Sequence, residues 1–162
     1  MAGDIKGKYG ASNQTITVTV ASLASSATAG RAGTAIDNTA NAFLDALVFA
    51  HFSIPDAVPA NDKAIYIYTY GTCNGGTNYT GGCTGTDAAY TMDDPTVLKL
   101  IGVIPIPTQN KIYYGGPFSV AAAFGGVLPD HWGIVVRNYC GQTIVNDANS
   151  KAYYQGVLAQ YT

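Results

Sequence analysis

The chain carries its clearest β-strand signal at Lys63-Ala-Ile-Tyr-Ile-Tyr-Thr-Tyr70. β-Branched and aromatic residues fill this stretch, and both types fit the pleated, half-buried surface of a sheet. Because side chains alternate along a strand, three tyrosines ending at Tyr70 share one face, while Ile65, Ile67 and Thr69 share the other. The stretch therefore predicts a strand with a tyrosine face and an isoleucine face.

Two further segments extend the β pattern toward the N-terminus. Gln14–Val20 alternates strictly between polar and apolar residues, which predicts a strand with one buried face. Asp45–Ser53 fits both helical and strand spacing. We predict a strand there because Pro55 and Pro59 follow closely and no capping box precedes it.

The rest of the chain repeats short apolar segments between turn residues. Gly115-Gly116-Pro117 is expected to break the chain before the apolar segment Phe118–Phe124. About eight strands in such a series predict an antiparallel β-sandwich of the jelly-roll type. The remaining predicted strands are Val97–Ile104, Lys111–Tyr114, Gly133–Cys140 and Tyr153–Tyr161.

Composition supports an all-β fold. All ten acidic residues are Asp, and the sequence contains no Glu. Glu, Lys and Arg usually solvate helix surfaces, whereas Asp favours caps and turns. The 19 Gly and 7 Pro residues supply turns throughout.

Charge and hydropathy argue against several classes of protein. With 48% apolar residues the chain is not disordered, and a net charge of −2 argues against nucleic-acid binding. Met1–Gly10 lacks the apolar region of a signal peptide, and no apolar window is long enough for a membrane helix, so we expect a soluble protein made in a cytoplasm. Only 11% of the residues are charged, which favours burial of surface in a homo-oligomer.

We expect one domain with an arm. Residues 14–162 show no internal repeat and no linker, which predicts a single β-sandwich domain. Residues 1–13 precede the first strand and contain three glycines, so they are predicted to form an N-terminal arm that reaches onto a neighbouring subunit.

Metal and disulfide candidates are few. Asp93 and Asp94 are adjacent before a proline; they are weak calcium candidates, and the same pattern is ordinary turn chemistry. Cys73 and Cys83 lie in one Gly/Thr-rich loop and are the candidate disulfide, with reduced thiols as the alternative. No zinc-ligand spacing is present, and no metal or cofactor is predicted.

No catalytic signature emerges. His51 lies in an apolar segment, where a hydrogen-bonded core or interface imidazole is expected. His131 follows Asp130, and Ser119 would complete a triad, but adjacent strand residues point to opposite faces. Since the chain also lacks a Gly-x-Ser-x-Gly elbow, we do not expect an enzyme.

Aromatic residues with a polar tip are the main candidates for partner binding. We single out Tyr9, Tyr79, Tyr90 and Trp132 as contacts to another protein or as stacking platforms for sugars. The alternative is that such residues fill the faces of a small sandwich.

Four stretches carry a resemblance that spans nearly the whole chain: Tyr9–Leu23, Ala35–Leu47, Gly116–Pro129 and Tyr154–Tyr161. In these stretches the chain resembles short structural proteins of tailed bacteriophages encoded in or near the head-assembly genes. The resemblance implies a capsid decoration, or cement, protein with a jelly-roll-like sandwich, located on the capsid surface of the virion. Its implied partners are the major capsid protein and copies of itself, and it implies neither catalysis nor a cofactor.

Two other functions stay open. A receptor- or carbohydrate-binding sandwich, at the tail tip or on the capsid exterior, would bind a host-surface glycan through exposed tyrosines and Trp132. A small hydrolase would depend on His131. The low charge favours the decoration protein, and only the number of aromatic residues favours glycan binding.

Overall fold

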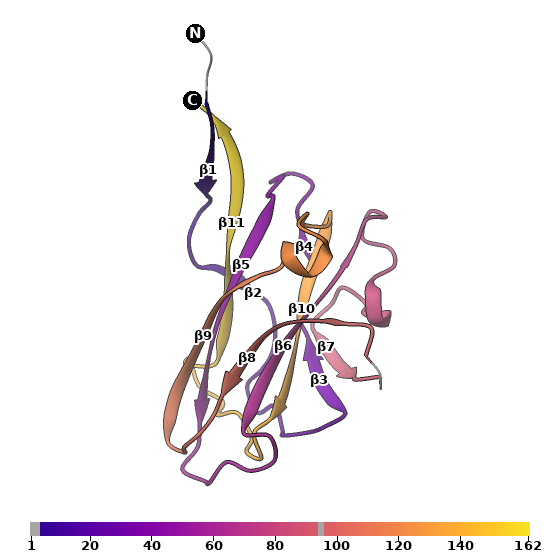
Figure 1. Ribbon diagram of the computed structural model, residues 1–162. Helices are drawn as coiled ribbons and strands as arrows, with labels where there is room; N and C mark the ends of the chain where they lie inside the picture. The colour runs from indigo at the N-terminus through magenta and orange to yellow at the C-terminus, as the bar shows by residue number, and fades with distance from the viewer. Residues whose placement is uncertain (1–3, 94–95) are drawn as a thin grey trace.

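The computed structural model describes residues 4–93 and 96–162, which form eleven strands in two antiparallel sheets (Figure 1). Sheet A has the order β1-β11-β5-β9, with β2 also paired to β11; sheet B has the order β7-β3-β10-β6-β8, with β4 paired to β10. The strands are β1 (Ile5–Tyr9), β2 (Gln14–Ile16), β3 (Ala29–Ala32), β4 (Ile36–Asp37), β5 (Asp45–Ile54), β6 (Ala64–Thr72), β7 (Ala88–Thr91), β8 (Lys99–Pro105), β9 (Lys111–Ser119), β10 (His131–Tyr139) and β11 (Lys151–Tyr161). The all-β prediction is confirmed.

The order of strand pairing is that of a jelly roll. Strands β2 and β11 pair in sheet A, β3 and β10 in sheet B, β5 and β9 in sheet A, and β6 and β8 in sheet B. Each pair is nested inside the previous one along the chain, and successive pairs alternate between sheets, which gives the eight strands of a double Greek key. Strands β1 and β7 are additions at one edge of each sheet. The predicted jelly-roll-like sandwich is confirmed.

The main core lies between the sheets and follows from side-chain alternation. Ile65 and Ile67 of β6 are fully buried in it, as predicted for the isoleucine face of the strand. In β5, even-numbered residues such as Val48 and Phe52 point inward, which confirms the strand predicted for Asp45–Ser53. No helix of the described residues is long and apolar enough to cross a membrane.

A second, smaller core covers the outer face of sheet B. Tyr68 and Tyr70 point there and pack with Cys83 from the loop that follows β6 and with Met92, which follows β7. The Tyr70 hydroxyl donates a hydrogen bond to the carbonyl oxygen of Gly33. The Gly/Thr-rich loop that holds Cys73 and Cys83 therefore packs on the tyrosine face of β6 through Cys83 and Tyr79.

Two strand boundaries differ from the prediction. Strand β2 ends at Ile16, because Thr17 and Thr19 turn toward sheet B, where Thr17 accepts a backbone hydrogen bond from Thr34 (2.7 Å). The expected break at residues 115–117 is wrong, since β9 runs through to Ser119. The β5–β9 register shifts by a bulge there, which places the Pro117 ring opposite Phe49 without interrupting the strand.

Asp87 fastens the N-terminal segment to sheet B. Its carboxylate accepts hydrogen bonds from the backbone N–H (3.0 Å) and hydroxyl of Thr19 and forms an ion pair with Arg31 of β3. Burial alone would raise the pKa of Asp87, but the hydrogen bonds from Arg31 and Thr19 outweigh burial and lower it below the usual value. The ionised carboxylate is thus the form that the fold stabilises.

We expect Asp87→Asn to lower the free energy of unfolding by about 2 kcal/mol at neutral pH, because it removes charge-assisted hydrogen bonds. A lowered pKa in the folded state adds stability above the unfolded-state pKa, and this contribution is lost as pH falls through the folded-state pKa. The difference between wild type and variant should therefore shrink below about pH 4 in urea titrations. Asp56→Asn, at an exposed loop position, is the control and should match wild type at every pH.

Candidate interaction surface

The two ends of the described chain form a projecting ribbon. Strand β1 pairs antiparallel with Val157–Tyr161, the last part of β11, whereas β5 pairs with β11 only as far as Val157. Beyond that point the ribbon has two strands and leaves the body of the sandwich (Figure 1). Every residue of β1 is exposed. A two-stranded ribbon is marginally stable on its own, which makes this element a natural contact for another molecule.

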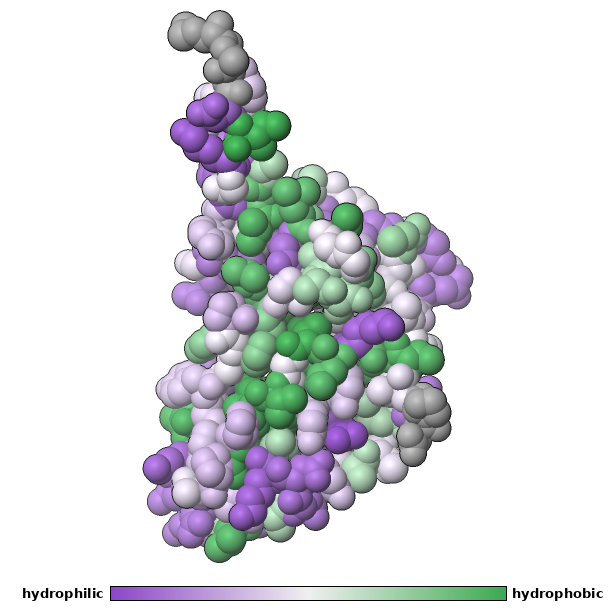
Figure 2. Space-filling model, viewed as in Figure 1, coloured by the Kyte–Doolittle hydropathy of each residue, from purple (hydrophilic) through white to green (hydrophobic). Residues whose placement is uncertain are grey.

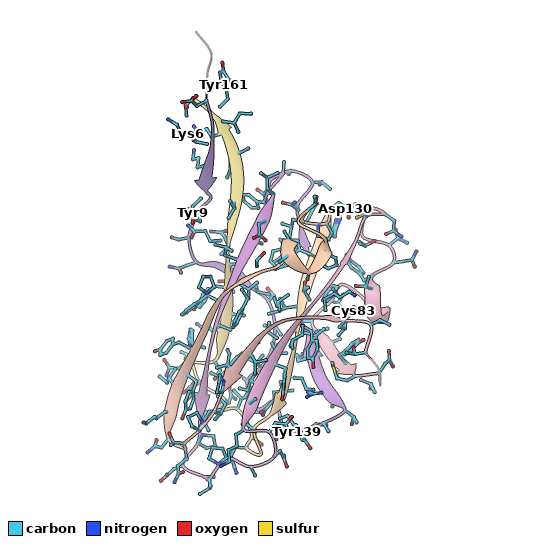
Figure 3. All side chains as sticks on the ribbon, viewed as in Figure 1. Lys6, Tyr9, Cys83, Asp130, Tyr139 and Tyr161 are labelled. Carbon is cyan, nitrogen blue, oxygen red and sulfur yellow. The ribbon has the colours of Figure 1, made fainter. Side chains whose placement is uncertain are left out.

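The ribbon has two unlike faces. Directly paired residues of antiparallel strands point to the same side, so Ile5 shares a face with Tyr161, and Tyr9 shares it with Val157. The other face carries Lys6, Lys8, Leu158 and Gln160. Figure 2 shows hydrophilic and hydrophobic groups on opposite sides of the ribbon, and Figure 3 labels Lys6, Tyr9 and Tyr161 on it. Ile5, Tyr9 and Tyr161 on the apolar face are 64% to 77% exposed, so residues 4–93 and 96–162 leave this face largely uncovered.

An aromatic cluster lies on the outer face of sheet A. His51 of β5 stacks on Tyr153 of β11 (ring centroids 5.7 Å apart) and lies beside Tyr114 of β9 (5.6 Å). Tyr114 in turn contacts Phe49 (6.2 Å). We call these four residues the aromatic cluster. The Nδ1 atom of His51 hydrogen-bonds with the carbonyl oxygen of Asn149 (2.9 Å) and so orients the ring at this surface.

A groove of about 310 Å³ joins the ribbon to the aromatic cluster. Its aromatic walls are the rings of Tyr9, Phe49 and Tyr153, and its polar groups include Gln155 and Asn13. The amide of Gln155 also donates a hydrogen bond to the carbonyl oxygen of Gly10 (3.1 Å), which fastens the chain between β1 and β2 to the sheet. Tyr9 is thus the predicted partner residue that lies at this surface.

Tyr79 and Tyr90 lie on the opposite sheet and are only partly exposed. The Tyr79 ring packs edge-on against Tyr70 (5.4 Å), and the Tyr90 hydroxyl donates to the carbonyl oxygen of Gly81 (2.7 Å). Both rings pack against the second core. The structure therefore does not bring them together with Tyr9.

The prediction that Trp132 contacts a partner is wrong. Its side chain is 0% exposed, and its ring packs edge-on against Tyr154 at 5.3 Å. Strand β10 lies inside sheet B between β3 and β6, so an inward-pointing residue on it reaches the middle of the core. The turn residues Pro129 and Asp130, which precede this strand, do not indicate that Trp132 is buried.

The residues considered for catalysis do not form a triad. The Ser119 hydroxyl donates to the Asp45 carboxylate (2.7 Å). His131 lies between Asp130 (Nδ1 to carboxylate oxygen, 3.5 Å) and Asp37 (Nε2 to carboxylate oxygen, 3.7 Å). Asp130 accepts a hydrogen bond from the backbone of Gly75, so this group fastens the loop after β6 to the start of β10.

Only one of the two metal candidates lies within the described residues. Asp93 is exposed, and Asp94 lies outside the described residues. Within residues 4–93 and 96–162, no group of three or more His, Cys or Asp side chains is arranged to hold a metal ion.

All three cysteines are free thiols in the structure. Cys73 is exposed, whereas Cys83 is buried in the second core and Cys140 in the main core. Burial raises the pKa of Cys83 to about 12 and also raises that of Cys140. The candidate pair Cys73 and Cys83 is not joined.

Sequence reasoning missed most of this surface. Phe49, Tyr153 and Tyr161 were not selected, because each has the pattern of an ordinary strand residue, and Ile5 was assigned only to the N-terminal arm. The available signal was that Tyr153–Tyr161 contains no charged residue. Comparison with protein-family models, with curated proteins and with solved structures finds no match.

We expect a thiol reagent to label only Cys73 in the native protein and all three cysteines after denaturation. Burial keeps the reagent away from Cys83 and Cys140 and disfavours the thiolate form that reacts. Mass spectrometry of iodoacetamide-treated protein measures this count. Cys73→Ser should abolish native labelling. Native protein with no reactive thiol, and a mass two hydrogens short, would show a Cys73–Cys83 disulfide instead.

Proposed function

We propose that the chain is a structural protein of a tailed-phage virion that decorates and stabilises the capsid surface through protein–protein contacts. The observation that supports this best is the ribbon, whose apolar face is exposed among the residues that the structure describes. Its partners in this proposal are the major capsid protein and copies of the same chain, and its location is the capsid surface.

The body of the molecule suits this task. A jelly roll with two cores supplies a rigid support, and the ribbon extends from it at one end (Figure 1). Twelve large apolar residues are exposed in the described chain, including Leu44 beside the base of the ribbon. A decoration protein covers such groups when it docks, which offsets the cost of leaving them in water.

We expect deletion of residues 1–12 to weaken binding to capsids more than it lowers the melting temperature. The deleted strand contributes no side chain to either core, so the body should keep its stability. The measurement adds wild-type or truncated protein to gradient-purified particles that lack it, from the phage that encodes the chain, and quantifies bound copies.

The control is the double variant Lys6→Gln/Lys8→Gln, which keeps the ribbon and its apolar face and should bind as wild type does. Equal occupancy with and without residues 1–12 would remove the role of the ribbon. Absence of the chain from particles of the parent phage would overturn the proposed function itself.

The groove favours a second candidate function, glycan binding at the virion exterior. Aromatic faces beside amide and hydroxyl groups are the chemistry of a sugar subsite, and Phe49 and Tyr153 line the groove together with Gln155. If this function holds, wild type should give signals on a glycan array that Tyr153→Ala abolishes. Tyr90→Phe, on the opposite sheet, should keep them, and an array without wild-type signal would dismiss this function.

A further inference from the structure

The apolar face of the ribbon continues directly into the aromatic cluster. Residues of β11 alternate without a register shift from the β5 pairing to the β1 pairing, so Tyr153, Val157 and Tyr161 point to the same side. Tyr153 belongs to the aromatic cluster, and Tyr161 belongs to the ribbon. We call this continuous surface the apolar strip: the aromatic cluster together with Ile5, Tyr9, Val157, Ala159 and Tyr161.

The apolar strip is large enough for a stable contact. Ile5, Tyr9, Phe49, Tyr114 and Tyr161 are between 40% and 77% exposed. At about 200 Å² for a large side chain, these five alone expose about 600 Å². A standard protein interface buries about 800 Å² on each partner, so the strip and the backbone and side chains at its margin supply one side of such an interface.

The strip is also almost free of charge. The outward-facing residues of Tyr153–Tyr161 and Ile5–Tyr9 include no charged side chain. Lys151, which pairs with His51, is exposed at the end of the strip that lies away from the ribbon. Asp45, at the margin opposite Val157, already accepts hydrogen bonds from Ser119 (2.7 Å) and Ala121 (2.8 Å). An uncharged surface can face its own copy without like-charge repulsion, whereas the lysine face of the ribbon cannot.

We propose that two copies of this chain pack strip against strip, antiparallel, so that the ribbon of each copy covers the aromatic cluster of the other. Tyr161 and Tyr153 lie four residues on either side of Val157, about 13 Å along the strand in each direction. A two-fold rotation that places the two strips face to face and antiparallel therefore brings Tyr161 and Ile5 of one copy onto Tyr153 and His51 of the second. The contact is isologous, as in most homodimers.

The inference deepens the self-association within the proposed function and does not depend on the capsid. If the chain dimerises through the strip but is absent from virions, the capsid proposal fails and the dimer stands. If the chain decorates capsids but is a monomer in solution at every concentration, the dimer fails and the decoration stands.

The test compares two adjacent exposed residues on opposite faces of the ribbon, Ala159→Glu in the strip and Gln160→Glu on the lysine face. Sedimentation equilibrium should show a wild-type dimer and an unchanged Gln160→Glu dimer. Ala159→Glu should raise the dissociation constant about a hundredfold, because it buries an unpaired charge. Equal melting temperatures at a concentration where all three are monomeric would show that both variants fold.

A cross-link tests the geometry. In a Cys73→Ser background, Tyr153→Cys and Tyr161→Cys are about 26 Å apart on one strand, too far to be joined within a chain. A disulfide between the two positions must therefore link two copies, and mild oxidation should form it. Three results would each overturn the proposal: a wild-type monomer, a dimer that survives Ala159→Glu, or a dimer without the 153–161 cross-link. If wild type is a monomer, the partner that covers the strip is a different protein.

Discussion

The whole interaction surface depends on strand β11 keeping one uninterrupted alternation over eleven residues. The strand pairs with β5 from Lys151 to Val157 and with β1 from Val157 to Tyr161, and neither register contains a shift. Gly156 is required on the inward side, because a Cβ atom there would come within 2.5 Å of the Phe43 ring. A one-residue slip would exchange the two faces, burying Tyr153 and Tyr161 and exposing inward residues such as Ala152 and Tyr154.

A contact between the sheets supports β11 in that orientation, in addition to its pairing with β5 and β2. Tyr154 points inward from β11 and meets Trp132 of β10 edge-on, with ring centroids 5.3 Å apart. Strand β10 is itself fixed in sheet B by nine residue pairs with β6. Trp132, which sequence reasoning assigned to a partner surface, therefore supports that surface from behind by fixing the strand that carries it.

Local pattern predicted the fold well because alternation is a local property. The isoleucine and tyrosine faces of β6 and the strand at Asp45–Ser53 follow from neighbours in the sequence. The ribbon does not, since it joins residues 5–9 to residues 157–161. The predicted arm at residues 1–13 did not anticipate that Ile5–Tyr9 is a strand paired with β11 of the same chain. The prediction for Trp132 was wrong for the same reason, because only the order of strands in sheet B shows that β10 is internal.

The distribution of lysines explains why association would use a sheet face and not a sheet edge. Unpaired edges invite non-specific strand pairing, and lysine, proline, bulges and short strands discourage it. Lysines lie on the edge strands β1, β8 and β9, the bulge of β9 contains Pro117, and β7 has only four residues. With these four edges protected, the apolar strip on the outer face of sheet A is the surface left for a specific contact. Four of the six lysines thus stand on edge strands, where non-specific strand pairing would begin.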